Sequence, residues 1–297
     1  MLSSDRLIYR VDARLRALLY GISPRWLVQY RYLRFTGRWF RAGSPRTLDE
    51  KLLWLMLYWR HPLKSRCADK YAVRSYVEEL GLGSLLTPLL GVFRSADEID
   101  FDELPDRFVL KTTHASQMNI ICADKSRLDV DDARRQLNAW LAMDISWLAG
   151  ELHYASIPPR IVCEAYLEDV PGKRLNDYKI YCFHGRPHCT LACTDRTDAG
   201  ANYDVYDVEW RRRLPYMKSN EGAVRRIEKP AAYEEMLSAA EVLARPFPFV
   251  RVDFYSVGGR PVFGELTFTP HGCIDNDMTD EAQFTMGRLL KLPEKLL

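Results

Sequence analysis

The chain of 297 residues has no long hydrophobic run and almost no excess charge of either sign. No apolar run approaches the roughly 20 residues that a helix needs to cross a bilayer. Lysine and arginine total 42 against 40 for aspartate and glutamate, so electrostatics gives no reason to expect a nucleic-acid partner. Charged residues such as Asp5, Arg6 and Arg10 interrupt any secretory apolar segment, which favours a cytoplasmic protein.

Metal-ligand spacings are also missing among the cysteines and histidines. The chain has seven cysteines, and most lie in apolar, strand-like runs where a thiol behaves as a small hydrophobe. Only Cys189 and Cys193 are close in sequence, and no second pair accompanies them. No such spacing occurs among His114, His153, His184, His188 and His271. We therefore expect a reduced protein without a cysteine–histidine metal site.

The first 46 residues differ from the rest because all their basic residues are arginine, opposed only by Asp5 and Asp12. Apolar residues at helical spacing predict an amphipathic helix over 5–20, and aromatic residues from Trp26 to Phe35 indicate a second. Such an arm can contact the inner membrane surface peripherally through residues 1–46. Alternatively, it is a helical extension packed on the main body, with arginine stems along apolar surface.

Beyond residue 46 the pattern passes from helices to strands. Residues 47–80 are typical of helices, with Thr47 or Asp49 as one cap and Asp69 as another. Strands are expected at 89–93, 107–111, 119–122 and 160–166, with a helix at 130–141. Hairpins over 178–193 and 249–268, a strand pair around 203–210 and a helix at 231–243 follow. This order predicts an α+β fold whose later part is largely antiparallel, with helices on one face.

The last hairpin carries the most informative constellation. A turn at Gly258-Gly259 places Asp253 opposite Glu265, and alternation puts Thr267 on the same face as Glu265. Like charges across a ladder are unfavourable without a cation between them. Oxygen ligands on a rigid hairpin suit Mg²⁺ that also holds substrate phosphates, although Arg251 could neutralise the pair instead.

Charged residues in the middle of the chain form two weaker constellations. Lys111 closes the apolar strand 108–110, and the polar segment 112–119, which includes Ser116, can cradle phosphates, although it contains no glycine. The alternative is an ordinary surface lysine. Asp177 and Lys179 share one face of a strand, where they form either a surface pair or part of a cleft. Glu164 lies inside an apolar strand and needs a partner.

The order of these segments resembles the TupA-like ATP-grasp family, which is associated with teichuronopeptide and other surface-polysaccharide biosynthesis. The resemblance extends from about Pro45 to Gly272. The segments that carry it include Asp49-Glu50-Lys51-Leu52, residues 68–74 (ADKYAVR), Phe108-Val109-Leu110-Lys111, residues 164–167 (EAYL), Asp177-Tyr178-Lys179, Asp195-Arg196 and residues 264–270 (GELTFTP).

The resemblance implies an ATP-grasp fold in which two α+β lobes clamp ATP. Its implied divisions are a basic helical extension (1–46), an N-terminal helical and α+β region (47–105), a small lobe with the phosphate loop and hinge (106–168) and a large lobe with the metal-binding hairpin (169–297). The implied nucleotide-binding residues are Lys70, Lys111, Ser116, Glu164, Tyr166, Leu167, Asp169 and Asp177. Arg196 and Lys179 are the implied catalytic residues, and Asp253, Glu265 and Thr267 the implied Mg²⁺ ligands.

The chemistry implied by the resemblance is ATP-dependent ligation of a carboxylate to an amine through an acyl phosphate. The small-molecule or saccharide carboxylate and the amine acceptor are then the expected partners, and His271-Gly272 is expected near the acceptor. Two alternatives remain: a glycosyltransferase of polysaccharide biosynthesis, and a non-catalytic relative, which the glycine-free segment 112–119 favours.

Overall fold

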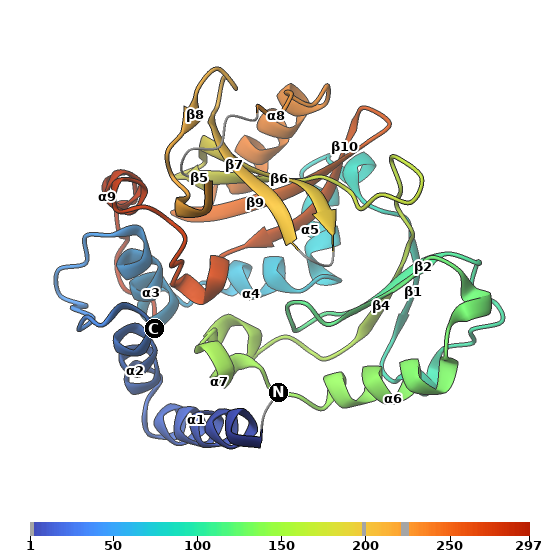
Figure 1. Cartoon of the computed structure of the whole chain (residues 1–297), viewed down its shortest axis with the longest axis horizontal. Coiled ribbons are helices and arrows are strands. Elements are labelled where there is room, and N and C mark those ends of the chain that lie inside the picture. The colour runs from blue at the N-terminus through green and yellow to red at the C-terminus, as the bar shows by residue number, and fades with distance from the viewer. Residues whose placement is uncertain (1–2, 198–199, 221–225) are drawn as a thin grey trace.

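The structure is a computed structural model that describes residues 3–197, 200–220 and 226–297 (Figure 1). The chain starts with five helices, and the predicted helices near 5–20 and over 47–80 are confirmed. They are α1 (Ser3–Ile22), α2 (Pro24–Thr36), α3 (Leu48–Tyr58), α4 (Pro62–Ala68) and α5 (Ala72–Glu79). Their ends follow local chemistry: Thr47 and Glu50 form a capping box at α3, and Gly37, with φ of 69°, ends α2.

A four-stranded antiparallel sheet forms the smaller lobe. Its strands are β1 (Leu89–Phe93), β2 (Phe108–Thr112), β3 (Asn119–Cys122) and β4 (Ile161–Ala165), in the order β1-β4-β2-β3. Phe108, Leu110 and Cys163 on these strands pack with Leu137 of α6 (Val130–Leu141) in a core separate from that of the larger lobe. The sheet includes β1, which precedes residue 106 in the chain.

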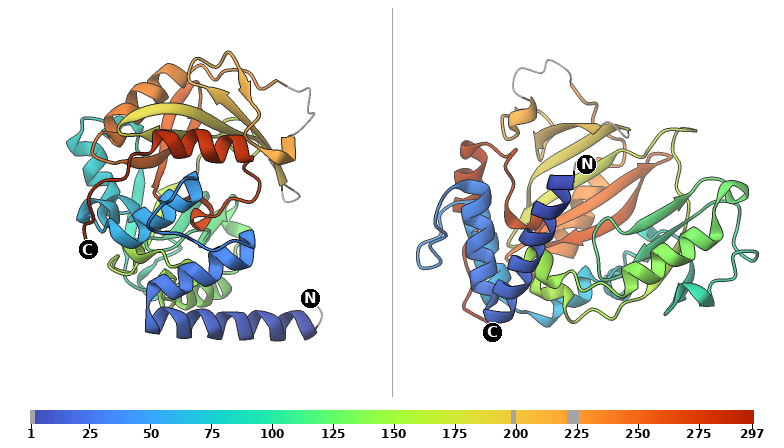
Figure 2. Two further views of the ribbon diagram at one scale, coloured as in Figure 1. Left: turned by 90° about the vertical axis from the view of Figure 1, so that its left-hand side faces the viewer. Right: turned by 60° about the horizontal axis from the view of Figure 1, so that its bottom comes forward.

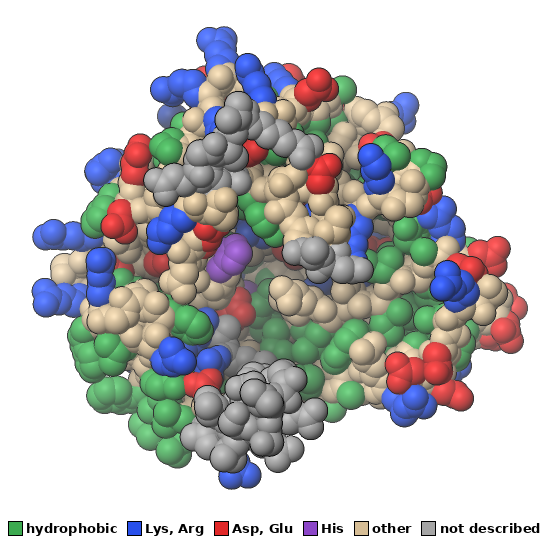
Figure 3. Space-filling model, in the orientation of Figure 1, with side chains coloured by type: hydrophobic (Ala, Val, Ile, Leu, Met, Phe, Trp, Pro, Cys, Tyr) green, Lys and Arg blue, Asp and Glu red, His purple; other side chains and the backbone are tan. Residues whose placement is uncertain are grey.

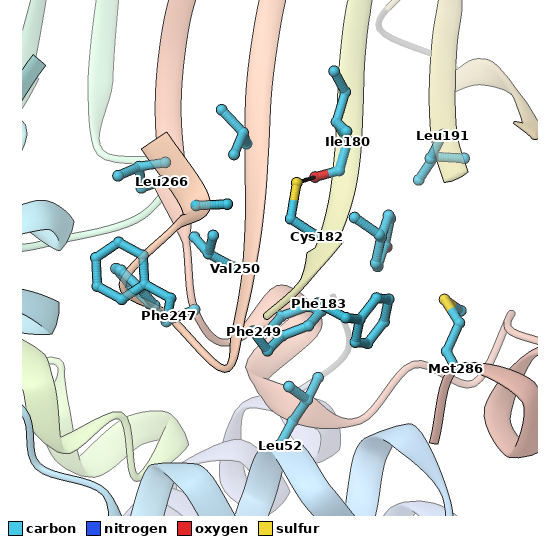
Figure 4. Packing of buried hydrophobic residues seen from close by; sticks show 14 of the residues in the cluster. Leu52, Ile180, Cys182, Phe183, Leu191, Phe247, Phe249, Val250, Leu266 and Met286 are labelled. Atoms are coloured by element: carbon cyan, nitrogen blue, oxygen red, sulfur yellow. Dashed lines mark hydrogen bonds between the residues drawn. The ribbon is translucent and has the colours of Figure 1, made fainter. Parts of the chain in front are cut away.

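A six-stranded antiparallel sheet forms the larger lobe. Its strands are β5 (Asp177–Phe183), β6 (Arg186–Thr197), β7 (Gly200–Asp207), β8 (Arg213–Leu214), β9 (Phe249–Val257) and β10 (Arg260–Thr267), in the order β10-β9-β5-β6-β7-β8. Helix α8 (Tyr233–Ala244) packs against β5, β6 and β9. Beyond the sheet, Leu52 of α3 and Met286 join the same core (Figure 4). The α+β fold and both predicted hairpins are thus confirmed.

Helices absent from the sequence prediction complete the fold. They are α7 (Ser146–Ala149) and α9 (Asp280–Leu289), with short 3-10 turns η1 (Gly83–Leu85), η2 (Ala96–Glu98), η3 (Lys125–Arg127), η4 (Leu152–Tyr154), η5 (Lys218–Asn220) and η6 (Pro270–Cys273). Helix α9 packs on α3 at Gly287, where an added Cβ would lie 2.3 Å from the carbonyl oxygen of Arg46. A glycine at position 287 therefore lets α9 pack closely against the start of α3.

The N-terminal helices form an extension at one end of the molecule. Helix α1 contacts α2 and α7, and α2 also contacts α3 (Figure 2). The prediction of a packed helical extension is therefore confirmed. Within the described part of the chain, no helix is both long and apolar enough to span a membrane.

Candidate functional site

A cavity of about 780 Å³ lies between the two lobes, and the space-filling view shows the molecule hollowed there (Figure 3). Both sheets contribute to its lining, through β2, β3 and β4 on one side and β5, β9 and β10 on the other. The predicted site residues that line it are Lys70, Lys111, Ser116, Glu164, Asp177, Lys179, Arg196, Asp253, Glu265 and Thr267. The fold therefore brings together side chains that are almost 200 positions apart in the sequence.

The β9–β10 hairpin pairs Glu265 directly with Asp253, as the turn position predicted. The ladder is irregular between Phe263 and Glu265, and Gly264 fits there because a Cβ would lie 2.9 Å from the carbonyl oxygen of Asp253. Glu265 remains accessible, with 47% of its side chain exposed, and accepts a 2.9 Å hydrogen bond from the Thr267 hydroxyl. Asp253, in contrast, is only 3% exposed.

Two cations surround the buried carboxylate of Asp253. Arg251 donates from Nε and Nη2 at 2.7 and 2.6 Å, and Lys179 donates from Nζ at 2.9 Å. Burial alone would raise the pKa of Asp253, but the charges of Arg251 and Lys179 outweigh it and hold the pKa below its ordinary value. The Arg251 guanidinium also lies 3.7 Å from Glu265, so Arg251 offsets charge on both carboxylates, as one interpretation of the sequence expected.

Lys179 links Asp253 to a second carboxylate, that of Asp177. It also donates to Asp177, whose carboxylate lies 3.9 Å from Arg196. Burial would lower the pKa of Lys179, but Asp253 and Asp177 raise it well above its ordinary value, so the ammonium stays charged. The face of the larger sheet that meets the cavity therefore carries a connected set of alternating charges.

The smaller lobe presents a second charged group. Lys111 donates to Glu164 at 2.6 Å, and Arg74 contacts the other oxygen of Glu164 at 3.3 Å. Glu164 therefore has the partners that its place in an apolar strand requires. Lys70 donates to the carbonyl oxygen of Ala115, in the segment after β2, and Lys70 and Lys111 both line the cavity from different elements. Such a convergence of ammonium groups suits an anionic ligand.

Three predicted nucleotide-binding residues are not brought into the cavity. Tyr166, Leu167 and Asp169 are absent from its described lining. The Arg107 guanidinium lies 4.0 Å from the ring centroid of Tyr166, and Asp169 accepts a 2.8 Å hydrogen bond from the backbone of Gly258. Asp169 thus connects the segment after β4 to the β9–β10 turn, and the nucleotide contacts of all three residues stay predictions.

Other residues in the cavity were not singled out as site residues from the sequence. They include Arg31, Arg74, Glu151 and Tyr255. Arg251 also lines the cavity, and the sequence had already offered it as a residue that could neutralise Asp253 and Glu265. Arg31 and Glu151 carry no local signal, because Arg31 lies on α2 and Glu151 lies just before η4, and the positions of both depend on the tertiary fold.

The residues at the hairpin fit a magnesium ion that takes most of its ligands from substrate phosphates rather than from the protein. Among the described residues, no group of three or more His, Cys, Asp or Glu side chains could hold a metal alone. Mg²⁺ bound with substrate phosphates needs only one or two protein carboxylates, and Glu265 and the Thr267 hydroxyl present oxygens to the cavity. Asp253 could contribute an oxygen beside its two cations.

The fold and cavity agree with what the family comparison shows. The sequence model of the TupA-like ATP-grasp family matches residues 50–291, and the chain therefore belongs to that family. The family predicted from the sequence and its ATP-grasp fold are confirmed. No curated protein matches the chain.

Among solved structures, the chain is similar to two amino-acid ligases. It is 15% identical to D-alanine–D-alanine ligase from Bacillus anthracis complexed with ATP, over 81% of this chain and 62% of that one, with a TM-score of 0.43. It is 16% identical to the L-amino acid ligase from Bacillus licheniformis, over 77% of this chain and 51% of that one, with a TM-score of 0.44. The chain thus spans less than two thirds of the length of these two structures.

Proposed function

We propose that this protein is an ATP-dependent carboxylate–amine ligase that works through an acyl phosphate. One observation carries the proposal: the cavity holds Lys70 and Lys111 on one side and the Asp253–Glu265 pair with Arg251 and Lys179 on the other. A site with several cations and two facing carboxylates suits a polyphosphate and a metal together. Membership of the TupA-like ATP-grasp family supports an ATP-dependent reaction at this site.

In this proposal Lys70 and Lys111 bind the phosphates of ATP, and the segment containing Ser116 lies against them. Glu265 and Thr267, with Asp253, would hold Mg²⁺, which when bound offsets the charge of the triphosphate. Lys179 and Arg251 hold Asp253 ionised, and Arg196 faces the transferred phosphoryl group. Glu164 orients Lys111.

The reaction has two displacements, each balanced in bonds. A substrate carboxylate oxygen bonds to the γ-phosphorus as the bond to the β-γ bridging oxygen breaks, which gives an acyl phosphate and ADP. An amine nitrogen then bonds to the acyl carbon, the bond to phosphate breaks, and the amine loses one proton. Cations around the cavity stabilise the charge that develops on the transferred group. No covalent bond to the enzyme forms.

The decisive experiment measures ADP release with pairs of acids and amines, including uronic acids and amino acids. Release that depends on both substrates, with formation of an amide, supports the ligase. If no pair of acid and amine gives ADP release and the protein binds UDP-sugars, the result would instead support a glycosyltransferase. A protein that binds neither nucleotide class would be a non-catalytic relative.

We also propose that the product is a cell-surface polysaccharide or its precursor, modified in the cytoplasm at the inner membrane surface. The TupA-like ATP-grasp family, which is associated with surface-polysaccharide biosynthesis, supports the proposed polysaccharide product. The N-terminal extension supports the proposed place at the membrane surface, because Leu18, Ile22, Trp26 and Trp39 are exposed there among exposed arginines. Exposed aromatic and basic residues together favour contact with anionic lipid.

A further inference from the structure

The turn that follows β10 carries a histidine in an unfavourable backbone conformation. This turn continues directly from the strand that holds Glu265 and Thr267, and His271 within it lines the cavity with 53% of its side chain exposed. His271 and Cys273 have positive φ, at 51° and 65°, a region that residues other than glycine rarely adopt. Such strain clusters at functional sites, so His271 is a candidate for a role that a glycine could not fill.

A buried carboxylate lies beside the imidazole of His271. Asp275 is 9% exposed, and its Oδ1 accepts a 3.0 Å hydrogen bond from the backbone of Asp277. Among the described residues, Oδ2 of Asp275 accepts no hydrogen bond, and Nε2 of His271 lies 3.7 Å from it. A buried acceptor without a donor is uncommon in folded proteins. The imidazole is the donor within reach, because such contacts are often long in the free enzyme and shorten when the substrate binds.

Two helices of the N-terminal half anchor this turn on both sides of the imidazole. Arg31 of α2 donates from Nη1 to the carbonyl oxygen of Gly272 at 3.2 Å. Asp49 of α3 accepts a 3.1 Å hydrogen bond from the backbone of Asp275. The charged groups that approach the turn from other elements therefore include a guanidinium and a carboxylate. Both contacts restrict the backbone, which limits where the side chain of His271 can move.

An imidazole beside a carboxylate is suited to take a proton. When Nε2–H points at Asp275, Nδ1 of the neutral imidazole carries no proton and is the basic atom. The carboxylate then offsets the positive charge that the imidazolium acquires. Lys179 and Arg196, which also line the cavity, cannot take a proton because both are already protonated.

The second displacement of the proposed reaction requires such a base. Most amines are protonated at neutral pH, and an ammonium group has no lone pair with which to attack the acyl carbon. Resting on the proposed ligase function, we propose that His271 is the general base that activates the amine and that Asp275 is its positioning residue. This role does not depend on which amine is joined.

The proton transfers balance as follows in this proposal. Nδ1 of His271 takes one proton from the substrate ammonium, which frees the lone pair on nitrogen. The nitrogen then bonds to the acyl carbon as the bond to phosphate breaks, and one further proton leaves with the phosphate. The imidazolium, held by Asp275, returns its proton to water.

The test compares two nucleophiles that differ in protonation. One is the amine that gives the fastest ADP release in the screen of acids and amines. The other is hydroxylamine, which is largely unprotonated at neutral pH and reacts with acyl phosphates without a base. His271→Gly is the variant of choice, because glycine accepts positive φ without strain and leaves space for added imidazole. We expect amine-dependent ADP release to fall about 100-fold, hydroxylamine-dependent release to stay near the wild-type rate, and free imidazole to restore much of the loss.

His184→Gly is the matched control. His184 also has positive φ, at 49°, but it lies in the turn between β5 and β6, outside the described lining of the cavity. This variant should change neither rate and should not respond to imidazole. Asp275→Asn should lower only the amine-dependent rate, about tenfold or more. It should lower that rate no further in the His271→Gly background, because a positioning residue acts through the histidine.

The remaining outcomes separate this proposal from the ligase proposal. Equal losses with both nucleophiles in His271→Gly, or no loss with either, would overturn the assignment of the base. Selective loss of amine-dependent release in Glu151→Gln but not in His271→Gly would assign the base to Glu151, the other proton acceptor that lines this part of the cavity. If hydroxylamine supports ADP release by the wild-type protein but no amine does, the base is overturned and acyl phosphate formation stands. If neither nucleophile supports ADP release with any acid, the ligase proposal itself fails.

Discussion

The two carboxylates of the β9–β10 hairpin have different physical roles although they face each other. Asp253 is buried between Arg251 and Lys179, whereas nearly half of the Glu265 side chain is exposed. Removing one member of a buried ion pair leaves the other charges without compensation. An exposed carboxylate can be changed with little effect on folding.

We therefore expect Asp253→Ala to lower the free energy of unfolding by about 3–5 kcal/mol, and Glu265→Gln by less than about 1 kcal/mol. Denaturant unfolding followed by circular dichroism measures both. Glu265→Gln should nevertheless weaken metal-dependent nucleotide binding about tenfold or more. Equal stability losses in the two variants would contradict the assignment of Asp253 to a buried charge network.

Asp49 provides a prediction about pH. Burial raises its pKa to about 7, although its carboxylate accepts a hydrogen bond from the backbone of Asp275 at 3.1 Å. Because the folded pKa exceeds the unfolded one, the folded state binds more protons at intermediate pH. The stabilisation of the folded state that comes from the protonated Asp49 carboxyl is complete below about pH 4. It is lost as the pH rises towards 7.

The Asp49→Asn variant removes this titration. Its stability relative to wild type should increase as the pH is raised from 4 to 7, by up to roughly 1.4 kcal/mol per pH unit. Denaturant unfolding of both proteins at several pH values measures the difference, in which other titrating groups largely cancel. A difference that does not change with pH would show that Asp49 is ionised normally in the folded protein.

At the scale of elements, regular periodicity and local caps were sufficient to predict most helices and strands. The 3.6-residue pattern predicted α1, the Thr47 cap located the start of α3, and the Gly258-Gly259 turn set the pairing of Asp253 with Glu265. Helix α9 was not predicted, although Thr279 is a local signal that caps it. The cavity contributions of Arg31 and Glu151 could not be predicted, since both depend on long-range packing.

The contact between α3 and α9 gives a test of element packing. Gly287→Ala adds a Cβ that meets the backbone of Arg46 and Thr47, at 2.3 and 3.0 Å. Because backbone atoms cannot rotate away, we expect destabilisation of about 1–3 kcal/mol or more. Gly43→Ala, which meets nothing within 4 Å, is the control and should change stability by less than about 0.5 kcal/mol. Thermal unfolding of both variants would decide, and a neutral Gly287→Ala would contradict this packing.

At the scale of the whole molecule, the N-terminal extension connects the proposed membrane contact to the site. Helix α2 presents exposed Trp26 on its outside and directs Arg31 into the cavity. We expect the protein to sediment with vesicles containing phosphatidylglycerol, less with phosphatidylcholine alone, and less at high salt.

The double variant Trp26→Ser, Trp39→Ser should weaken vesicle binding. Phe284→Ser, which replaces an exposed aromatic residue on α9, is the matched control. If both variants bind vesicles as wild type does, the extension is only a structural support for the cavity.

The central claim concerns the cavity between the lobes, and calorimetric titration with a non-hydrolysable ATP analogue tests it most directly. We predict Mg²⁺-dependent binding to wild type that weakens about tenfold or more in Lys111→Met and in Glu265→Gln. Lys173→Met, at an exposed position away from the cavity, should bind as wild type does. No binding to wild type, or binding that is equally tight without metal and in both cavity variants, would contradict the account.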